Sequence, residues 1–154
     1  MKVVVASDHA GVDAKKEICK TLLELGHEAI DLGPQTADSV DYPDYASKAC
    51  RMIQHGRAER GILICGTGIG MSVVANKHRA IRASLVTNEY TAKMSRAHGN
   101  ANVMCLGARV VDIRAMSQLV RIWTSEPFEG GRHEQRLKKL MELDAKIPMT
   151  ETIE

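Results

Sequence analysis

Two periodicities of apolar residues alternate along the chain and predict alternating strands and helices. Short runs rich in Val, Ile and Leu are typical of buried strands, whereas apolar residues at every third or fourth position are typical of amphipathic helices. Glycines and prolines separate these stretches. We predict strands at residues 2–7, 28–32, 61–64, 81–86 and 103–106, and helices at 12–25, 45–55, 71–78, 89–98, 113–124 and 132–147.

Strands that alternate with helices through short connections predict a parallel sheet covered by helices on both faces. The expected fold class is therefore α/β: a single-domain, Rossmann-like three-layer sandwich with a five-stranded parallel sheet. We expect residues 1–147 to form this domain and residues 148–154 to form a C-terminal tail. Ligands of such folds bind beyond the carboxyl ends of the strands, which brings residues 8–9, 65–70 and 107–109 to one edge.

The composition narrows the class of protein. A chain of 154 residues, 44% apolar and 26% charged, is typical of one globular domain. A net charge of +2 favours neither nucleic acid nor a membrane surface as a partner. The amino-terminal residues turn polar too soon for a signal peptide, and no apolar run approaches the roughly 20 residues that span a bilayer. We therefore expect a cytoplasmic protein with reduced thiols.

Residues 62–72, ILICGTGIGMS, carry the strongest candidate chemistry. A strand ends at Cys65, a loop with alternating glycines follows, and then a helix begins. Glycines let backbone N–H groups face an anion, and the start of a helix stabilises a thiolate. Thr67 lies inside this loop, where its hydroxyl can shuttle a proton or simply hold the turn. The spacing GxGxG is neither a Walker loop nor a strict dinucleotide-binding motif.

The other cysteines serve as a comparison for Cys65. The four cysteines form no CxxC pair and no zinc-type spacing, so we expect no metal site. Cys19, Cys50 and Cys105 lie in helical or strand-like runs, where buried packing is the expected role. Buried packing is also the alternative for Cys65 itself.

Three further side chains can handle protons or bind a sugar. Asp8 and His9 directly follow the first strand, where a carboxylate and an imidazole can bind sugar hydroxyls or phosphate. Alternatively, Asp8 caps the next helix and His9 is solvated. His98 closes a predicted helix, where it can interact with the helix dipole or open a sugar ring as a general acid or base.

Three arginines are candidates for binding phosphate. Arg132 and Arg136 share one face of a helix near its start, where two positive charges oppose the helix dipole. An anionic ligand would offset this repulsion, and the guanidinium fork suits phosphate. Arg109, just after the last strand, is the third candidate. Solvation at the surface is the alternative for all three.

Six blocks of sequence carry a family resemblance: DHAG at 8–11, DYPDYA at 41–46, GILICGTGIGMSVVANK at 61–77, the run at 97–103, LGARVV at 106–111 and EGGRHEQR at 129–136. In this order, over about residues 1–145, they resemble the sugar-phosphate isomerases of the ribose-5-phosphate isomerase type B and galactose-6-phosphate isomerase family. The resemblance implies interconversion of a phosphorylated aldose and ketose without metal or cofactor. It also implies a homodimer with two active sites between the subunits.

The resemblance assigns roles residue by residue. Cys65 matches the catalytic base that moves a proton between C1 and C2, and Met71 stands where another branch of the family has a glutamate. The remaining roles fall on the loop amides of Gly66, Gly68, Ile69 and Gly70 for the enediolate, Thr67 for proton handling, His98 for ring opening, Asp8, His9 and Tyr42 for substrate contact, and Arg109, Arg132 and Arg136 for phosphate.

One departure from the family pattern concerns the sugar. The ring-opening histidine is usually followed by an asparagine that contacts the reacting end of the sugar, but here Gly99 follows His98. Asn100 can replace that contact only if the loop shifts. Family members act on four-, five- and six-carbon sugar phosphates, so Gly99 leaves the choice among these sugars open.

Our leading hypothesis is an isomerase that converts D-ribose 5-phosphate to D-ribulose 5-phosphate through a cis-enediolate. The alternatives are an isomerase of a tetrose 4-phosphate or hexose 6-phosphate, a non-catalytic sugar-phosphate sensor, and a flavodoxin-like nucleotide-binding module. The presence of Cys65, Thr67 and His98 together argues against a sensor, which needs no base. Whether dimers pair into tetramers stays open.

Overall fold

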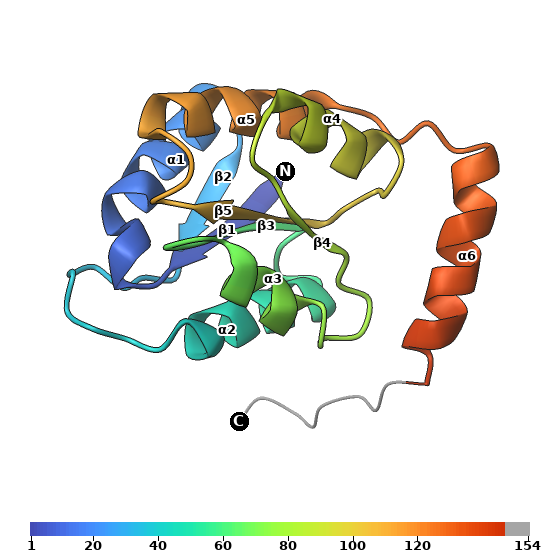
Figure 1. The fold of residues 1–154 in the computed structure, drawn as a ribbon, viewed down its shortest axis with the longest axis horizontal. Helices are drawn as coiled ribbons and strands as arrows, with labels where there is room; N and C mark the ends of the chain where they lie inside the picture. Colours follow the sequence, from blue (N-terminus) through green and yellow to red (C-terminus); the bar gives the residue numbers. More distant parts are fainter. Residues whose placement is uncertain (147–154) are drawn as a thin grey trace.

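The computed structural model describes residues 1–146, which form one parallel sheet with helices on both faces (Figure 1). The strand order is β2-β1-β3-β5-β4, and all neighbouring strands run parallel. The predicted single-domain α/β fold with five parallel strands is confirmed, while the predicted tail lies outside the described residues. The elements are β1 (Lys2–Ser7), η1 (His9–Gly11), α1 (Val12–Glu24), β2 (Glu28–Asp31), α2 (Tyr42–Gln54), β3 (Arg60–Cys65), α3 (Ile69–Ala75), β4 (Ala83–Leu85), α4 (Glu89–Ala97), β5 (Val103–Gly107), α5 (Ile113–Ser125) and α6 (Arg132–Asp144).

The sheet separates two hydrophobic cores, because successive side chains of a strand point to opposite faces. On one face, Ile62 and Ile64 of β3 pack with residues of α1, α4 and α5. On the other face, Leu63 and Cys65 pack with residues of α2 and α3. Figure 1 shows α1, α4 and α5 on one side of the sheet and α2 and α3 on the other. The side chain of Cys65 therefore packs on the side of the sheet that α2 and α3 cover.

Helices α2 and α3 and strand β4 begin or end at other residues than the sequence predicts. Helix α2 begins at Tyr42 instead of residue 45, because Pro43 fits the first turn, where its missing N–H has no partner to lose. Helix α3 begins earlier and ends earlier than predicted, directly after Gly68 in the left-handed conformation. Strand β4 is shorter than predicted and pairs with β5 at the edge of the sheet.

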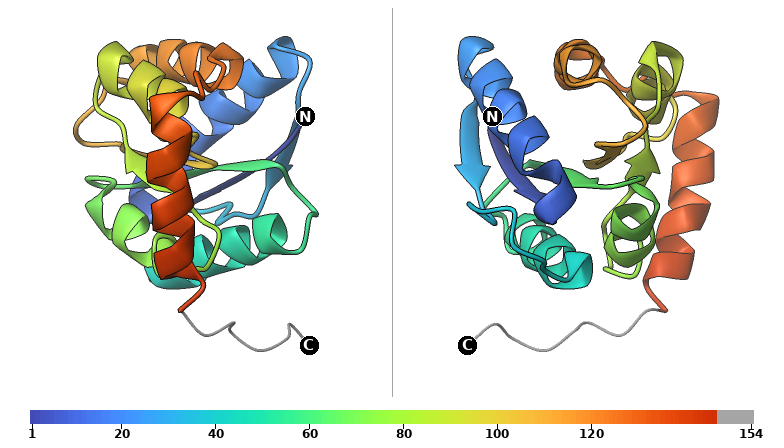
Figure 2. Two further views of the ribbon diagram at one scale, coloured as in Figure 1. Left: turned by 90° about the vertical axis from the view of Figure 1, so that its right-hand side faces the viewer. Right: turned by 60° about the vertical axis from the view of Figure 1, so that its left-hand side comes forward.

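Helix α6 lies apart from both helix layers, beyond the β4 edge of the sheet (Figures 1 and 2). The large apolar side chains Leu140, Met141 and Leu143 of this helix are between 46% and 60% exposed. Apolar surface gathered in this way is typical of a face that another chain or segment covers.

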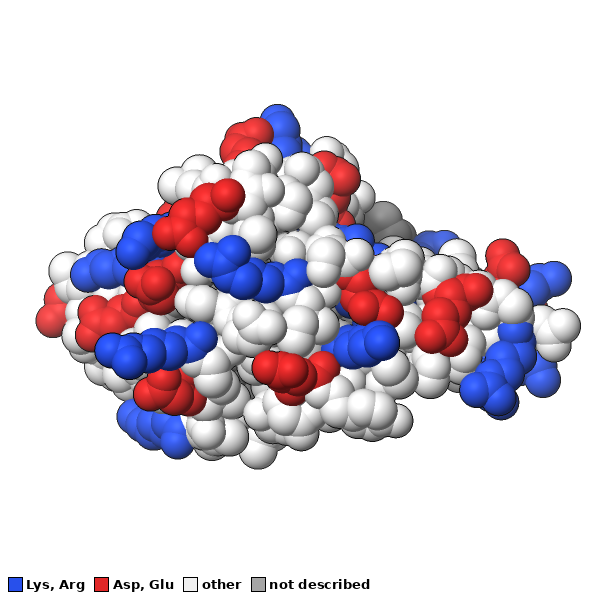
Figure 3. Space-filling model, turned by 90° about the horizontal axis from the view of Figure 1, so that it is seen from above, with Lys and Arg blue, Asp and Glu red and all other residues white. Residues whose placement is uncertain are grey.

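The surface above α1 and α5 mixes lysines and arginines with acidic residues (Figure 3). This interspersed pattern agrees with the small net charge of the chain. Among the described residues, no helix combines the length and the apolar character that crossing a membrane requires.

Candidate active site

An open cavity of about 450 Å³ lies where the connections after β1 and β3 diverge. The chain leaves β1 for β2 on one side, and it leaves β3 for β4 and β5 on the other. Such a switch point is where parallel α/β sheets bind ligands, at the carboxyl ends of the strands. The cavity is lined by Asp8, Tyr42, Cys65, Gly66, Thr67, Ile69, Gly70, Val73 and Arg109.

Cys65 is the last residue of β3, and its side chain is held by the loop that follows. The residue is 5% exposed, and its Sγ accepts a hydrogen bond from the N–H of Gly68 at 3.1 Å. Thr67 Oγ1 accepts one from the N–H of Ile69 at 3.2 Å. This backbone N–H and the end of the strand together hold the sulfur atom at the wall of the cavity.

The other three thiols all have raised pKa values. Burial raises the pKa of Cys50 to about 12. Burial, followed by the nearby Asp31 carboxylate, raises the pKa of Cys19 to about 11. Burial also raises the pKa of Cys105 well above its usual value. These three groups are neutral thiols at pH 7, as the packing role predicts.

At two positions of the loop, neighbouring atoms lie so close to the backbone that only glycine fits. Gly68 has φ of +79°, and a Cβ there would lie 2.9 Å from the carbonyl carbon of Leu106 in β5. Gly70 lies under the ring of Tyr42, which a Cβ would meet at 2.7 Å. The loop can therefore fold against β5 and beneath the tyrosine only because these positions lack side chains.

Asp8 caps a helical turn and also lies at the wall of the cavity. Its Oδ1 accepts a hydrogen bond from the N–H of Ala10 at 2.9 Å and so caps η1, yet the residue also lines the cavity. His9 is not among the lining residues. Its Nδ1 accepts a hydrogen bond from the N–H of Val40 at 3.3 Å, which ties it to the loop before α2.

Arg109 supplies the positive charge of the cavity. It follows β5, and its backbone N–H donates to the carbonyl of Gly66 at 2.9 Å. Its guanidinium lies over Gly66, where a Cβ would meet Nη1 at 2.8 Å. A cation beside the Cys65 loop favours an anionic ligand such as a phosphorylated sugar.

His98 and Cys65 lie at opposite ends of the strands of the sheet. Cys65 pairs with Gly107 at the carboxyl end of β5, whereas His98 closes α4 just before the amino end of β5. The length of β5 alone separates the two ends by about 13 Å. Arg132 and Arg136 belong to α6 and do not line the Cys65 cavity. The predicted site residues of one chain thus form two groups.

The second group is built around three side chains from α4, the 126–131 loop and α6. The rings of His98 and His133 stack with centroids 4.0 Å apart and an angle of 14°. Their Nε2 atoms lie 3.5 and 3.6 Å from Oε2 of Glu129. Two imidazoles and a carboxylate are metal-ligand types, but the Nε atom of Arg132 donates to Nε2 of His133 at 3.4 Å. This arginine occupies the lone pair that a metal would need.

Gly99 and Asn100 belong to a tightly bonded helix end. A Cβ at Gly99 would lie 2.9 Å from the carbonyl oxygen of Ser95, so this position has little room for a side chain. Asn100 has φ of +43°, and its Oδ1 accepts from Nη1 of Arg96 at 2.9 Å. Its carbonyl accepts from Arg82. A contact between Asn100 and the sugar stays a prediction, and it requires the bond to Arg96 to open.

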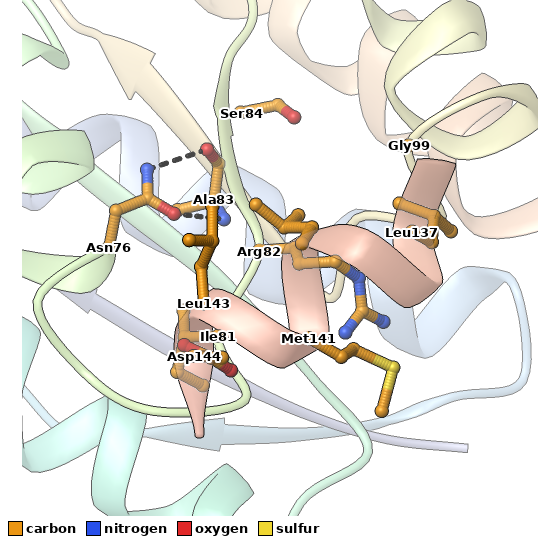
Figure 4. Close-up of a pocket in the computed structure, with 11 residues that line it drawn as sticks. Asn76, Ile81, Arg82, Ala83, Ser84, Gly99, Leu137, Met141, Leu143 and Asp144 are labelled. Carbon is orange, nitrogen blue, oxygen red and sulfur yellow. Dashed lines mark hydrogen bonds between the residues drawn. The ribbon is translucent and has the colours of Figure 1, made fainter. Parts of the chain in front are cut away.

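A separate cavity of about 410 Å³ lies between α6 and the β4 edge (Figure 4). Leu137, Met141 and Leu143 of α6 line it together with Ile81 and Arg82. None of the residues lining the Cys65 cavity lines this one. The α6 cavity is therefore a largely apolar hollow separate from the Cys65 cavity, and Gly99, next to His98, also lines it.

Sequence reasoning assigned no role to Glu129 or His133. Both lie in the block EGGRHEQR, and their separation by four residues is a visible signal. Their meeting with His98 depends on how the loop after α5 folds back onto α4, which spacing does not reveal.

Comparisons with known proteins identify the family of this chain. Residues 3–140 match the ribose/galactose isomerase family. The chain is 40% identical to ribose-5-phosphate isomerase B of Escherichia coli, over 93% of this chain and 96% of that protein. The structure of Clostridium thermocellum ribose-5-phosphate isomerase B matches with a TM-score of 0.92 and 44% identity, over 95% of this chain and 99% of the other.

A further solved structure is that of Mycoplasma genitalium ribose-5-phosphate isomerase B with bound ribulose-5-phosphate. It matches with a TM-score of 0.90 and 37% identity, over 94% of this chain and 97% of the other. The family match covers most of the chain, and these relatives are matched over nearly their whole length. The chain therefore belongs to the ribose/galactose isomerase family and is an isomerase.

Proposed function

We propose that this enzyme interconverts D-ribose 5-phosphate and D-ribulose 5-phosphate through a cis-enediolate, with Cys65 as the base. One observation carries the proposal. The sulfur atom of Cys65 accepts a hydrogen bond from an amide of the glycine loop, and it lies at the wall of an open cavity that is also lined by the positively charged Arg109. The names of the Escherichia coli relative and of the ribulose-5-phosphate complex from Mycoplasma genitalium support the choice of sugar.

The proposed reaction begins with opening of the furanose ring. His98 takes up the proton of the O1 hydroxyl and delivers a proton to the ring oxygen O4 as the C1–O4 bond breaks, which leaves an open-chain aldehyde. Asp8 orients the sugar for this step.

Proton transfer between carbons follows. The Cys65 thiolate removes the C2 proton, and the electron pair moves onto O1 to give the enediolate, which the loop amides stabilise. Thr67 moves a proton between O2 and O1, and Cys65 returns its proton to C1. Because the base must be a free thiol, we expect the enzyme to act in the cytoplasm, where thiols stay reduced.

We further propose that the working unit is a homodimer. One chain holds the Cys65 group and the His98 group at opposite ends of the strands, so neither end alone has every residue that the reaction needs. A second copy that brings His98, Arg132 and Arg136 to the Cys65 cavity would complete it. The exposed apolar side chains of α6 support such an interface, because they need a cover.

The test is a panel of initial isomerisation rates on tetrose, pentose and hexose phosphates. We expect a clear maximum on ribose 5-phosphate, loss of turnover in Cys65→Ala and normal turnover in the control Cys19→Ala. A maximum on another sugar would contradict the choice of ribose and point to the Gly99 region as the determinant of specificity. Binding without turnover across the panel would favour the sensor.

A further inference from the structure

We propose that Glu129 is a positioning residue that orients His98 for ring opening, within the cluster His98–Glu129–His133. This inference rests on the proposed function, which assigns ring opening to His98. It adds a residue to which neither the sequence analysis nor that proposal gives a role.

The backbone around Glu129 is shaped to bring the cluster together. The N–H of Glu129 donates to the carbonyl of Ala97 at 3.0 Å, which fastens the loop to the end of α4 beside His98. Gly130 and Gly131 then both take positive φ, +67° and +58°. This turn is one that residues with side chains rarely adopt, and it starts α6 so that His133 comes to lie against His98.

The contacts of His133 direct the carboxylate toward His98. Burial, followed by the neighbouring His98 and Arg132, lowers the pKa of His133 and favours its neutral form at pH 7. In the neutral ring, an Nε2 atom that accepts from Arg132 carries no proton. Glu129 then has one imidazole N–H within reach, that of His98.

The consequence for His98 concerns which nitrogen reacts. A carboxylate 3.5 Å from Nε2 favours the tautomer with the proton on that nitrogen, which leaves Nδ1 free to exchange a proton with the sugar. His133 limits rotation of the ring by stacking on it. Nδ1 of His98 is then the atom that exchanges a proton with the sugar, while Glu129 touches only the imidazole.

Two reactions of the same enzyme separate ring opening from proton transfer. Ribose 5-phosphate is a closed furanose and needs both steps. Ribulose 5-phosphate carries its phosphate on O5 and stays open, so exchange of its C1 hydrogen with deuterated water needs only the proton transfer. In Glu129→Gln, we expect turnover of ribose 5-phosphate to fall about tenfold or more. Exchange into ribulose 5-phosphate should change less than about twofold, since Cys65 is untouched.

The matched control is Glu126→Gln, three residues earlier on the same loop, which should leave both rates unchanged. Glu129→Asp keeps the charge but is one methylene shorter, so it should recover part of the lost turnover. Equal losses in both reactions would show a structural role, and no loss in either would show no role; both results overturn the proposal. If Glu129→Gln does not fold, the test uses Glu129→Asp. The deciding quantity is then the rate of ribose 5-phosphate turnover divided by the rate of C1 exchange in ribulose 5-phosphate, and a ratio equal to that of the wild type overturns the proposal.

Failure of the proposed function would look different. If the wild-type enzyme neither turns over ribose 5-phosphate nor exchanges ribulose 5-phosphate, the assignment of the sugar fails before any variant is compared. If the wild-type enzyme catalyses both reactions and the Glu129 variant has the same ratio of turnover to exchange as the wild type, only the role of Glu129 fails.

Discussion

At the scale of single residues, one thiol among four is set apart by its partner. Cys65 faces a cavity and receives an amide hydrogen bond, whereas Cys50 and Cys105 are enclosed by core residues. The sequence could indicate this difference, because glycines and a helix follow only Cys65.

Alkylation by iodoacetate at pH 7.5 should therefore modify Cys65 first and stop turnover. The other cysteines should react slowly, because burial raises the pKa of Cys19 to about 11 and that of Cys50 to about 12. Peptide mapping by mass spectrometry at partial inactivation checks the order of labelling. Loss of turnover that follows labelling of Cys19, with Cys65 unmodified, would refute the special role of Cys65.

Gly66 and Gly68 should respond differently to alanine. A Cβ at Gly66 meets only the flexible end of Arg109, so Gly66→Ala should fold normally but displace the guanidinium and raise KM for the sugar phosphate. A Cβ at Gly68 meets the β5 backbone at a positive φ, so Gly68→Ala should lower the free energy of unfolding by about 1–3 kcal/mol. Urea titration and initial rates measure both effects, and equal stability of the two variants would count against this account.

At the scale of elements, an ion pair between the buried Lys15 and the partly exposed Asp31 joins α1 to β2. Lys15 is fully buried, and its Nζ lies 2.6 Å from a carboxylate oxygen of Asp31. Partial burial acts to raise the pKa of Asp31, but hydrogen bonds from Lys15, the Gly33 amide and Gln35 outweigh it and lower this pKa below its usual value. A lowered pKa in the folded state adds stability above the unfolded pKa, and that stability is lost as pH falls through the folded pKa.

Asp31→Asn should lower the free energy of unfolding at pH 7 by about 3 kcal/mol, because it leaves the ammonium of Lys15 buried without a counter-charge. The loss should shrink as pH falls below about 4, because the carboxylate of the unfolded chain is protonated there while the folded one, whose pKa is lower, becomes neutral only at still lower pH. The control is Asp13→Asn, an exposed acid 3.9 Å from Lys16 whose loss should change little. Urea denaturation at pH 7 and pH 3 measures these differences, and equal losses in the two variants would exclude the predicted role of the Lys15–Asp31 pair.

Most strands and helices of this fold could be predicted from the sequence, whereas one cluster of side chains could not. The alternation of apolar periods predicted every strand and helix of the sheet layers, because the central strands β1, β3 and β5 are short apolar runs and the helices between them have one apolar face. The start of α2 was misplaced, since Pro43 can end a loop or open a helix. The cluster of His98, Glu129 and His133 was not predictable, because it forms between segments about 30 residues apart whose packing has no local signature.

At the scale of the whole molecule, the proposed homodimer would bring together the two groups of predicted site residues, which one chain holds at opposite ends of the strands. This leads to a complementation prediction: Cys65→Ala and His98→Ala should each be inactive on ribose 5-phosphate. Mixed after reversible dissociation, they should recover about a quarter of wild-type activity, since half the dimers are mixed and each has one complete site. Size-exclusion chromatography with light scattering confirms the dimer, and a mixture without recovered activity would contradict a shared site.

The central claim, that Cys65 is the base, is tested most directly by NMR of ribulose 5-phosphate in deuterated water. The wild-type enzyme should exchange the C1 hydrogen at least as fast as it turns over. The Cys65→Ala variant should still bind the sugar phosphate. Its rate of C1 hydrogen exchange should fall by a factor of about 1,000 or more, because the proton acceptor is gone. Exchange at the wild-type rate in Cys65→Ala would show that another group moves the proton.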